Sequence, residues 1–250
     1  MLKRGLYARL EGGLEAVVDR PSHQRSLAHG LWRDGLFPVP QHRCTGRSAR
    51  CPEQGEREDA AVRRVSFECL AGDEQQLKFS PEDTYLISYR EFLAFFANLQ
   101  TITRHDLIVG ANMVYGWMPR ILTFHGSDME AAFADAVRIL NCARGRCPVT
   151  SAEIGRLKGL IDNSVVAASK LLHFVNPNVY AIWDSRVCKY IHGTAYQVSN
   201  IERYTEYLDI CRQLVAHPGF RALHASINSK IGYDVSCYRA VEIVMYSAAR

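Results

Sequence analysis

The feature that most constrains the fold is the apolar density of residues 165–175, VVAASKLLHFV. Val165, Ala168, Leu172 and Val175 recur at intervals of three and four residues, so they share one face of a helix. Further apolar side chains widen this face until few positions remain for solvent. A helix that is apolar almost all round must be covered by other elements, so this segment predicts a core helix.

The chain after this helix predicts a turn, a buried connection and a second helix. Residues 176–178 are Asn-Pro-Asn, and proline disfavours the helical conformation in the residue before it, while asparagine tolerates turn geometry. Residues 179–183 are too apolar to lie in water and too few for a helix of their own. Asp184 stands at an N-cap position, where a carboxylate accepts hydrogen bonds from the first backbone N–H groups of a helix.

Helix start signals recur through the rest of the chain. Four serine or threonine residues are followed three positions later by glutamate, which is the pattern of a capping box. These pairs are Ser88–Glu91, Ser127–Glu130, Thr150–Glu153 and Ser199–Glu202. With few alternating strand patterns, they predict an all-α domain over residues 81–250, a compact multi-helix bundle of roughly eight helices.

Residues 1–80 differ in composition from the predicted helical domain. Arginine is frequent, and residues 38–57 contain Pro, Gly, Ser, Arg and Gln without a period, which is typical of loop or disorder. We expect a basic, loosely ordered extension, with a short helix over residues 6–18 and a strand over residues 65–70. It is either a basic arm for nucleic acid or a poorly packed extension, or even non-native sequence from a mis-chosen start codon, and we favour the alternatives to the basic arm.

The composition narrows the class of protein. A hydrophobic content of 48% over 250 residues predicts a globular chain with a real core. The net charge of +4 is compatible with nucleic acid without requiring it. No apolar run approaches the roughly 18 residues of a membrane span, and the N-terminus lacks a secretory apolar region, so we expect no membrane partner and a cytoplasmic location.

The cysteines do not predict a metal site. Eight are scattered through the chain, which is too large to need disulfide bonds for stability. Cys44 with Cys51 and His42, and Cys142 with Cys147, are the nearest approaches to a ligand set. Neither set supplies the four ligands of a tetrahedral zinc site. We therefore expect no metal and no cofactor.

The run Asp184-Ser185-Arg186-Val187, preceded by a helix, a loop and apolar residues, carries a family resemblance. Residues 160–191 resemble the second catalytic half of the helix-hairpin-helix DNA glycosylase superfamily, the endonuclease III and 8-oxoguanine glycosylase group. There the aspartate of a D-T-H-V-like or D-T-R-V-like run stabilises positive charge on the sugar as the base leaves. The resemblance implies a glycosylase-like helical fold with Asp184 as its catalytic carboxylate.

The chain also departs from the pattern of that family. The hairpin glycines that approach a DNA phosphate fall at Asp162 and Ser164, and the lysine nucleophile of bifunctional members falls at about Val166. Lys170 lies one turn further, roughly 6 Å along an ideal helix, and is a displaced substitute at most. The cluster of four iron–sulfur cysteines is also missing. The resemblance then implies a monofunctional enzyme, in which water captures the sugar.

Six residues are candidates for the site. The catalytic candidates are Asp184, His173 and Lys170, and the substrate-binding candidates are Trp183, Arg186 and Lys189. A carboxylate can stabilise an oxocarbenium-like sugar, a histidine can transfer protons, an arginine can clamp a phosphate, and tryptophan can stack on a base.

Structural explanations compete with each of these roles. Asp184 can be a helix cap, His173 a hydrogen-bonded core residue, and Arg186 the partner of a buried Glu242. Trp117, Tyr115 and Trp183 can fill the core instead of stacking on a base.

The sequence leads us to expect a nucleic-acid-binding helical protein, with DNA as its partner, that acts as a monofunctional DNA N-glycosylase-like hydrolase in DNA repair. The alternatives are a non-catalytic protein of the same fold, and a protein-interaction module with an exposed apolar patch. The surroundings of Asp184 separate them. A basic cleft containing Lys170, Arg186 or Lys189 favours nucleic acid, whereas a sealed carboxylate is architectural.

Overall fold

The computed structural model describes residues 65–249, except 81, 119, 146 and 147. These residues belong to one unit, Glu56–Arg250. The predicted helix over residues 6–18, the basic extension up to residue 64 and the cysteines at 44 and 51 lie outside the described residues.

The described part of the chain is all-α. Its helices are α1 (Phe67–Glu74), α2 (Thr84–Ala97), α3 (Arg104–Tyr115), α4 (Met129–Arg144), α5 (Ser151–Leu160), α6 (Val165–Val175), α7 (Ser185–His192), α8 (Ile201–Val215), α9 (Phe220–Ile231) and α10 (Cys237–Ala248). An isolated β-bridge joins Phe124 to Ile161. The all-α prediction is confirmed, and none of these helices is both long and apolar enough to cross a bilayer.

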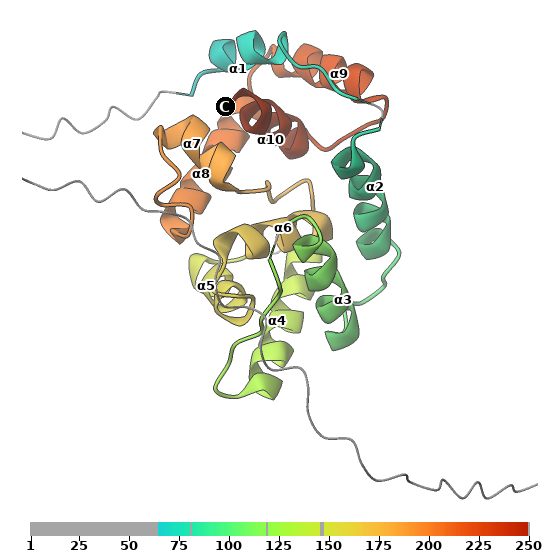
Figure 1. The fold of residues 1–250 in the computed structure, drawn as a ribbon, viewed down its shortest axis with the longest axis vertical. Coiled ribbons are helices and arrows are strands. Elements are labelled where there is room, and N and C mark those ends of the chain that lie inside the picture. The colour runs from blue at the N-terminus through green and yellow to red at the C-terminus, as the bar shows by residue number, and fades with distance from the viewer. Residues whose placement is uncertain (1–64, 81, 119, 146–147, 250) are drawn as a thin grey trace, which may run out of the picture. The chain divides into compact units, whose positions relative to one another are not determined.

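Helix α6 is the centre of the first group of helices, as the apolar density of its sequence predicted. All its residues except Val166 are buried, and it contacts α2, α3, α4 and α5, which surround it in Figure 1. Helices α2 and α3 approach each other closely at Gly110, where an added Cβ would lie 2.3 Å from Cζ of Phe96. The glycine is therefore required by packing.

Helix α10 is the centre of the second group. Eight of its twelve residues are buried, among them Arg239 and Glu242, and it contacts α1, α7, α8 and α9. The segment between α6 and α7 connects the two groups. Residues 180–183 of this segment are buried, which confirms the predicted buried connection.

The predicted strand over residues 65–70 is wrong, because this segment enters helix α1. The Ser66 side chain accepts a hydrogen bond from the backbone N–H of Cys69, which caps the helix, and Leu70 is fully buried. A single apolar face of a short segment does not distinguish strand from helix. Helix α1 contacts α9 and α10, so helical packing extends into the region that the sequence analysis assigned to the extension.

One of the four predicted capping boxes is confirmed, and it is the box of Thr150 and Glu153 at the start of α5. Ser88 lies inside α2, where its hydroxyl donates to the carbonyl oxygen of Thr84 at 2.7 Å. Helices α4 and α8 are capped by Asp128 and Asn200, one residue after the predicted serines. Aspartate and asparagine cap a helix as well as serine does, so the N-cap is the residue that follows the serine in both helices.

Candidate functional site

The turn between α5 and α6 has an unusual backbone. Asp162 and Asn163 have φ angles of 52° and 50°, which lie in the left-handed region that asparagine and aspartate tolerate better than other non-glycine residues. Asp162 occupies a position where the family pattern has glycine. Its N–H donates to the carbonyl oxygen of Thr123 at 2.9 Å, so this amide is used within the protein.

The connection before α7 is fixed by α6. The N–H of Trp183 donates to Oγ of Ser169 at 3.0 Å, and this oxygen also lies 3.2 Å from the carbonyl oxygen of Trp183. The indole N–H of Trp183 donates to the carbonyl oxygen of Val198 at 2.7 Å. These hydrogen bonds fix the position of the backbone at Trp183, the residue immediately before Asp184.

Asp184 caps α7 and also lines a cavity. Its Oδ1 accepts a hydrogen bond from the N–H of Val187 at 2.9 Å, as the N-cap prediction required. The side chain is half-buried, and its second oxygen forms no hydrogen bond within the described part of the chain. The carboxylate is therefore not sealed, and one of its oxygens remains available to a ligand.

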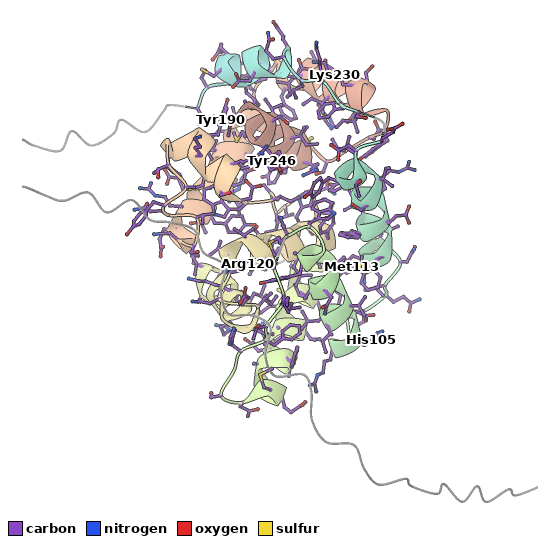
Figure 2. The ribbon with its side chains drawn as sticks, viewed as in Figure 1. His105, Met113, Arg120, Tyr190, Lys230 and Tyr246 are labelled. Carbon is purple, nitrogen blue, oxygen red and sulfur yellow. The ribbon has the colours of Figure 1, made fainter. Side chains whose placement is uncertain are left out.

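The cavity has a volume of about 680 Å³ and lies where α2, α6 and α10 meet the start of α7. Four aromatic rings line it, those of Phe79, Tyr85, Trp117 and Tyr246. Figure 2 labels two lining residues, Arg120 in the loop after α3 and Tyr246 on α10. The size and the mixture of aromatic and charged walls are those of a small-molecule site.

Lys170 reaches this cavity from the buried face of α6. Its side chain is only 8% exposed, and its ammonium forms no hydrogen bond or ion pair with the described residues. Its Nζ lies 5.9 Å from the ring centroid of Trp117. Burial lowers the pKa of Lys170, although Asp184 and Glu242 act in the opposite direction.

Glu242 and Arg239 form a buried ion pair in the same wall. They are 3% and 6% exposed, and Nη1 of Arg239 donates to Oε2 of Glu242. The guanidinium also lies 4.6 Å from the ring centroid of Tyr89. Burial raises the pKa of Glu242 to about 7, against the attraction of Arg239.

Arg186 takes a different partner from the one considered in the sequence analysis. Its guanidinium lies over the ring of Tyr246, 4.6 Å from the centroid, and Glu242 is paired with Arg239 instead. Arg186 is exposed and lines the cavity. It is therefore placed to contact a ligand at the mouth.

His173 lies in the core and does not line the cavity. Its Nδ1 is 2.7 Å from the carbonyl oxygen of Tyr180, and its Nε2 is 2.8 Å from the hydroxyl of Tyr89. A carbonyl oxygen only accepts, so Nδ1 carries the proton and Nε2 accepts from Tyr89. Burial lowers the pKa of His173 to about 3, which keeps the ring neutral at physiological pH.

The structure brings together three of the six candidates, Asp184, Lys170 and Arg186. Trp183 is fully buried and, like His173, belongs to the core. Lys189 is exposed on α7 and does not line the cavity.

Sequence reasoning missed Arg239 and Tyr246 as parts of the site. One signal for Arg239 was present, because it and Glu242 are three residues apart in an otherwise apolar helix. Opposite charges at this spacing lie on one helix face, and in a buried helix they indicate a paired polar wall.

The described residues contain no group of three or more His, Cys, Asp or Glu side chains that could hold a metal ion. Comparison of the chain with protein-family models, with curated proteins and with solved structures found no match in any of the three.

Proposed function

We propose that the cavity binds one nucleotide of DNA and that the protein hydrolyses its N-glycosidic bond, with Asp184 as the carboxylate that stabilises the cationic sugar. One observation carries the proposal. Asp184 lines a cavity of ligand size and keeps one carboxylate oxygen that the helix cap does not use. A residue needed only as a cap does not require access to a cavity.

The cavity walls suit a nucleotide. Tyr85, Trp117 and Tyr246 offer ring faces or edges to a flat base, and stacking on aromatic side chains contributes about 1 to 3 kcal/mol per base. Arg120 and Arg186 are exposed at the same cavity, where a guanidinium can bind the phosphates on either side of the nucleotide.

The reaction follows from the position of the carboxylate. As the bond between base and sugar breaks, positive charge develops on the sugar, and a partly desolvated carboxylate stabilises this charge more than water does. A water molecule then adds to the sugar carbon, because the hairpin position of the family lysine is occupied by Val166. The products are a free base and an abasic sugar.

A second candidate is a non-catalytic protein of the same fold that binds a ligand in this cavity. The hairpin between α5 and α6 favours it. Asp162 brings a carboxylate to a position that would approach a phosphate, and its amide donates to Thr123. Both features weaken the contact with DNA that such a hairpin can make.

Base release from duplexes tests the proposal. The full chain is incubated with duplexes that carry uracil, alkylated or oxidised bases, and the free base is measured. Asp184→Asn removes the charge but keeps the N-cap, because asparagine caps a helix as well as aspartate. We expect release by the wild type and a loss of about 100-fold or more in the variant.

Asp209→Asn is the matched control, since Asp209 is an exposed carboxylate on α8 away from the cavity. It should leave the rate unchanged. Equal rates for the wild type and Asp184→Asn would remove the proposed role of Asp184. Binding of a duplex without any base release would favour the non-catalytic alternative.

A further inference from the structure

Lys170 differs in its surroundings from Lys78, Lys158 and Lys230. Lys158 donates to the carbonyl oxygen of Ser199 at 3.1 Å, and Lys230 lies 2.6 Å from the carboxylate of Glu74. Lys78 is exposed to water. Lys170 is buried and lacks such a partner, and an unpaired buried ammonium is costly.

A buried lysine can avoid this cost by losing its proton, and a neutral amine in a desolvated pocket is a nucleophile for carbonyl compounds. Burial lowers the pKa of Lys170 and thereby favours the neutral amine. The charged groups that act on it are Asp184, Glu242 and Arg239. The two carboxylates oppose the loss of the proton, whereas Arg239 favours it.

We propose that Lys170 forms an imine with the aldehyde group of a ligand bound in the cavity, and that Glu242 supplies the proton for the loss of water. The ligand class is a small aldehyde with a flat or apolar body, since Tyr85, Trp117 and Tyr246 line the same cavity as the amine, and the Trp117 ring lies 5.9 Å from Nζ. This inference does not depend on the proposed action on DNA.

The chemistry balances with the groups present. The nitrogen lone pair attacks the carbonyl carbon, the electron pair of the C=O π bond moves to oxygen, and a proton passes from nitrogen to oxygen to give a carbinolamine. Glu242 then protonates the hydroxyl, the C–O bond breaks, and water leaves as the C=N bond forms. One aldehyde, one amine and one proton give one protonated imine and one water.

Burial shifts both groups toward the protonation states that the step requires. The pKa of Glu242, raised by burial to about 7, leaves part of this carboxyl protonated, while the lowered pKa of Lys170 enlarges the neutral fraction of the amine. Asp184 lines the same cavity, and its negative charge stabilises the protonated imine. A proton donor with a pKa near the working pH is the effective choice for such a step.

Reductive trapping tests the inference. The full chain is treated at neutral pH with one equivalent of benzaldehyde and with sodium cyanoborohydride, which converts an imine into a stable amine. Peptide mapping by mass spectrometry then locates the adduct. We expect the first adduct on Lys170, its loss in Lys170→Met, and its retention in Lys78→Met, which removes an exposed lysine of the same cavity.

Two further measurements guard against a structural effect. The preference for Lys170 should disappear when the wild type is unfolded in urea. Glu242→Gln should slow trapping at Lys170 by about 100-fold, the low end for a positioned proton donor, without slowing trapping at Lys78. Trapping at Lys170 no faster than at Lys78 in the folded protein would overturn the proposal, whatever the outcome of base release. An unchanged rate in Glu242→Gln would overturn the role of Glu242.

Discussion

Replacement of Lys170 by methionine should make the protein more stable. Methionine keeps an unbranched, flexible stem of similar length and fills the same space, while the buried ammonium is removed. The ammonium costs several kcal/mol to bury without an ion pair. The ring of Trp117, 5.9 Å from Nζ, offsets about 1 kcal/mol of this cost. The carboxylates of Asp184 and Glu242 offset a further part of it by attraction over a longer distance.

The net gain in the free energy of unfolding should be about 2 kcal/mol. For a folded unit of this size, such a gain corresponds to a rise in Tm of about 4 to 8 °C. Urea unfolding, followed by the helical circular dichroism signal, measures the difference between the two proteins. A site residue that lowers stability is typical of a functional position.

The gain should depend on pH. The pKa of Lys170 in the folded state is lowered from its ordinary value of 10.5, so at low pH the lysine is charged in both states and its cost is present in full. As the pH rises through the folded-state pKa toward 10.5, the folded protein sheds the proton first and the wild type recovers stability. The advantage of methionine should therefore be largest at about pH 6 and shrink toward about pH 10.

Lys230→Met is the matched control, because Lys230 forms an ion pair with Glu74 at 2.6 Å. This variant should lose about 1 kcal/mol. If Lys170→Met is less stable than the wild type at about pH 6 while Lys230→Met behaves as expected, the ammonium of Lys170 has a stabilising partner. The reasoning about an unpaired charge would then be refuted.

Three further predictions concern the cap, the core histidine and the closest helix contact. Asp184→Ala should lose about 1 kcal/mol by loss of the N-cap, whereas Asp184→Asn should unfold at the wild-type urea concentration; equal losses would deny the capping role. His173 has a pKa of about 3 when folded and 6.5 as its ordinary value, so stability should fall as the pH drops from 6.5 toward 3. At about pH 4.5 the wild type should have lost about 3 kcal/mol more than His173→Gln, and parallel pH profiles would contradict this. Gly110→Ala should cost about 2 kcal/mol, because the new methyl group meets the ring of Phe96 at 2.3 Å; Gly72→Ala, with open space around it, is the control, and equal stabilities would show that the helices shift apart freely.

The parts of the fold that the sequence predicted best are those in which local pattern and tertiary burial agree. The apolar face of residues 165–175, the turn at Pro177 and the cap at Asp184 are of this kind. The segment at Val65–Leu70 was mistaken for a strand, because its helix is stabilised by a serine cap and by contacts with α9 and α10. Contacts of that range are not visible in a local pattern.

The cavity was predicted only in part for a similar reason. The helical spacing placed Lys170 and His173 on the same segment, but it could not show which side chain reaches a cavity and which is buried against Tyr89. The burial of the ion pair of Arg239 and Glu242 involves long-range contacts, since Arg239 lies over the rings of Tyr89 and Trp117. An isolated charge pair in a sequence does not reveal what surrounds it.

The hydroxyl of Ser169 has a consequence for ligands. It contacts both the N–H and the carbonyl oxygen of Trp183, so the residue before Asp184 is anchored to the helix that carries Lys170. The backbone positions that carry the amine and the carboxylate are therefore held at a fixed separation. A compound that spans the two groups at one fixed length should bind far better than homologues one methylene longer or shorter.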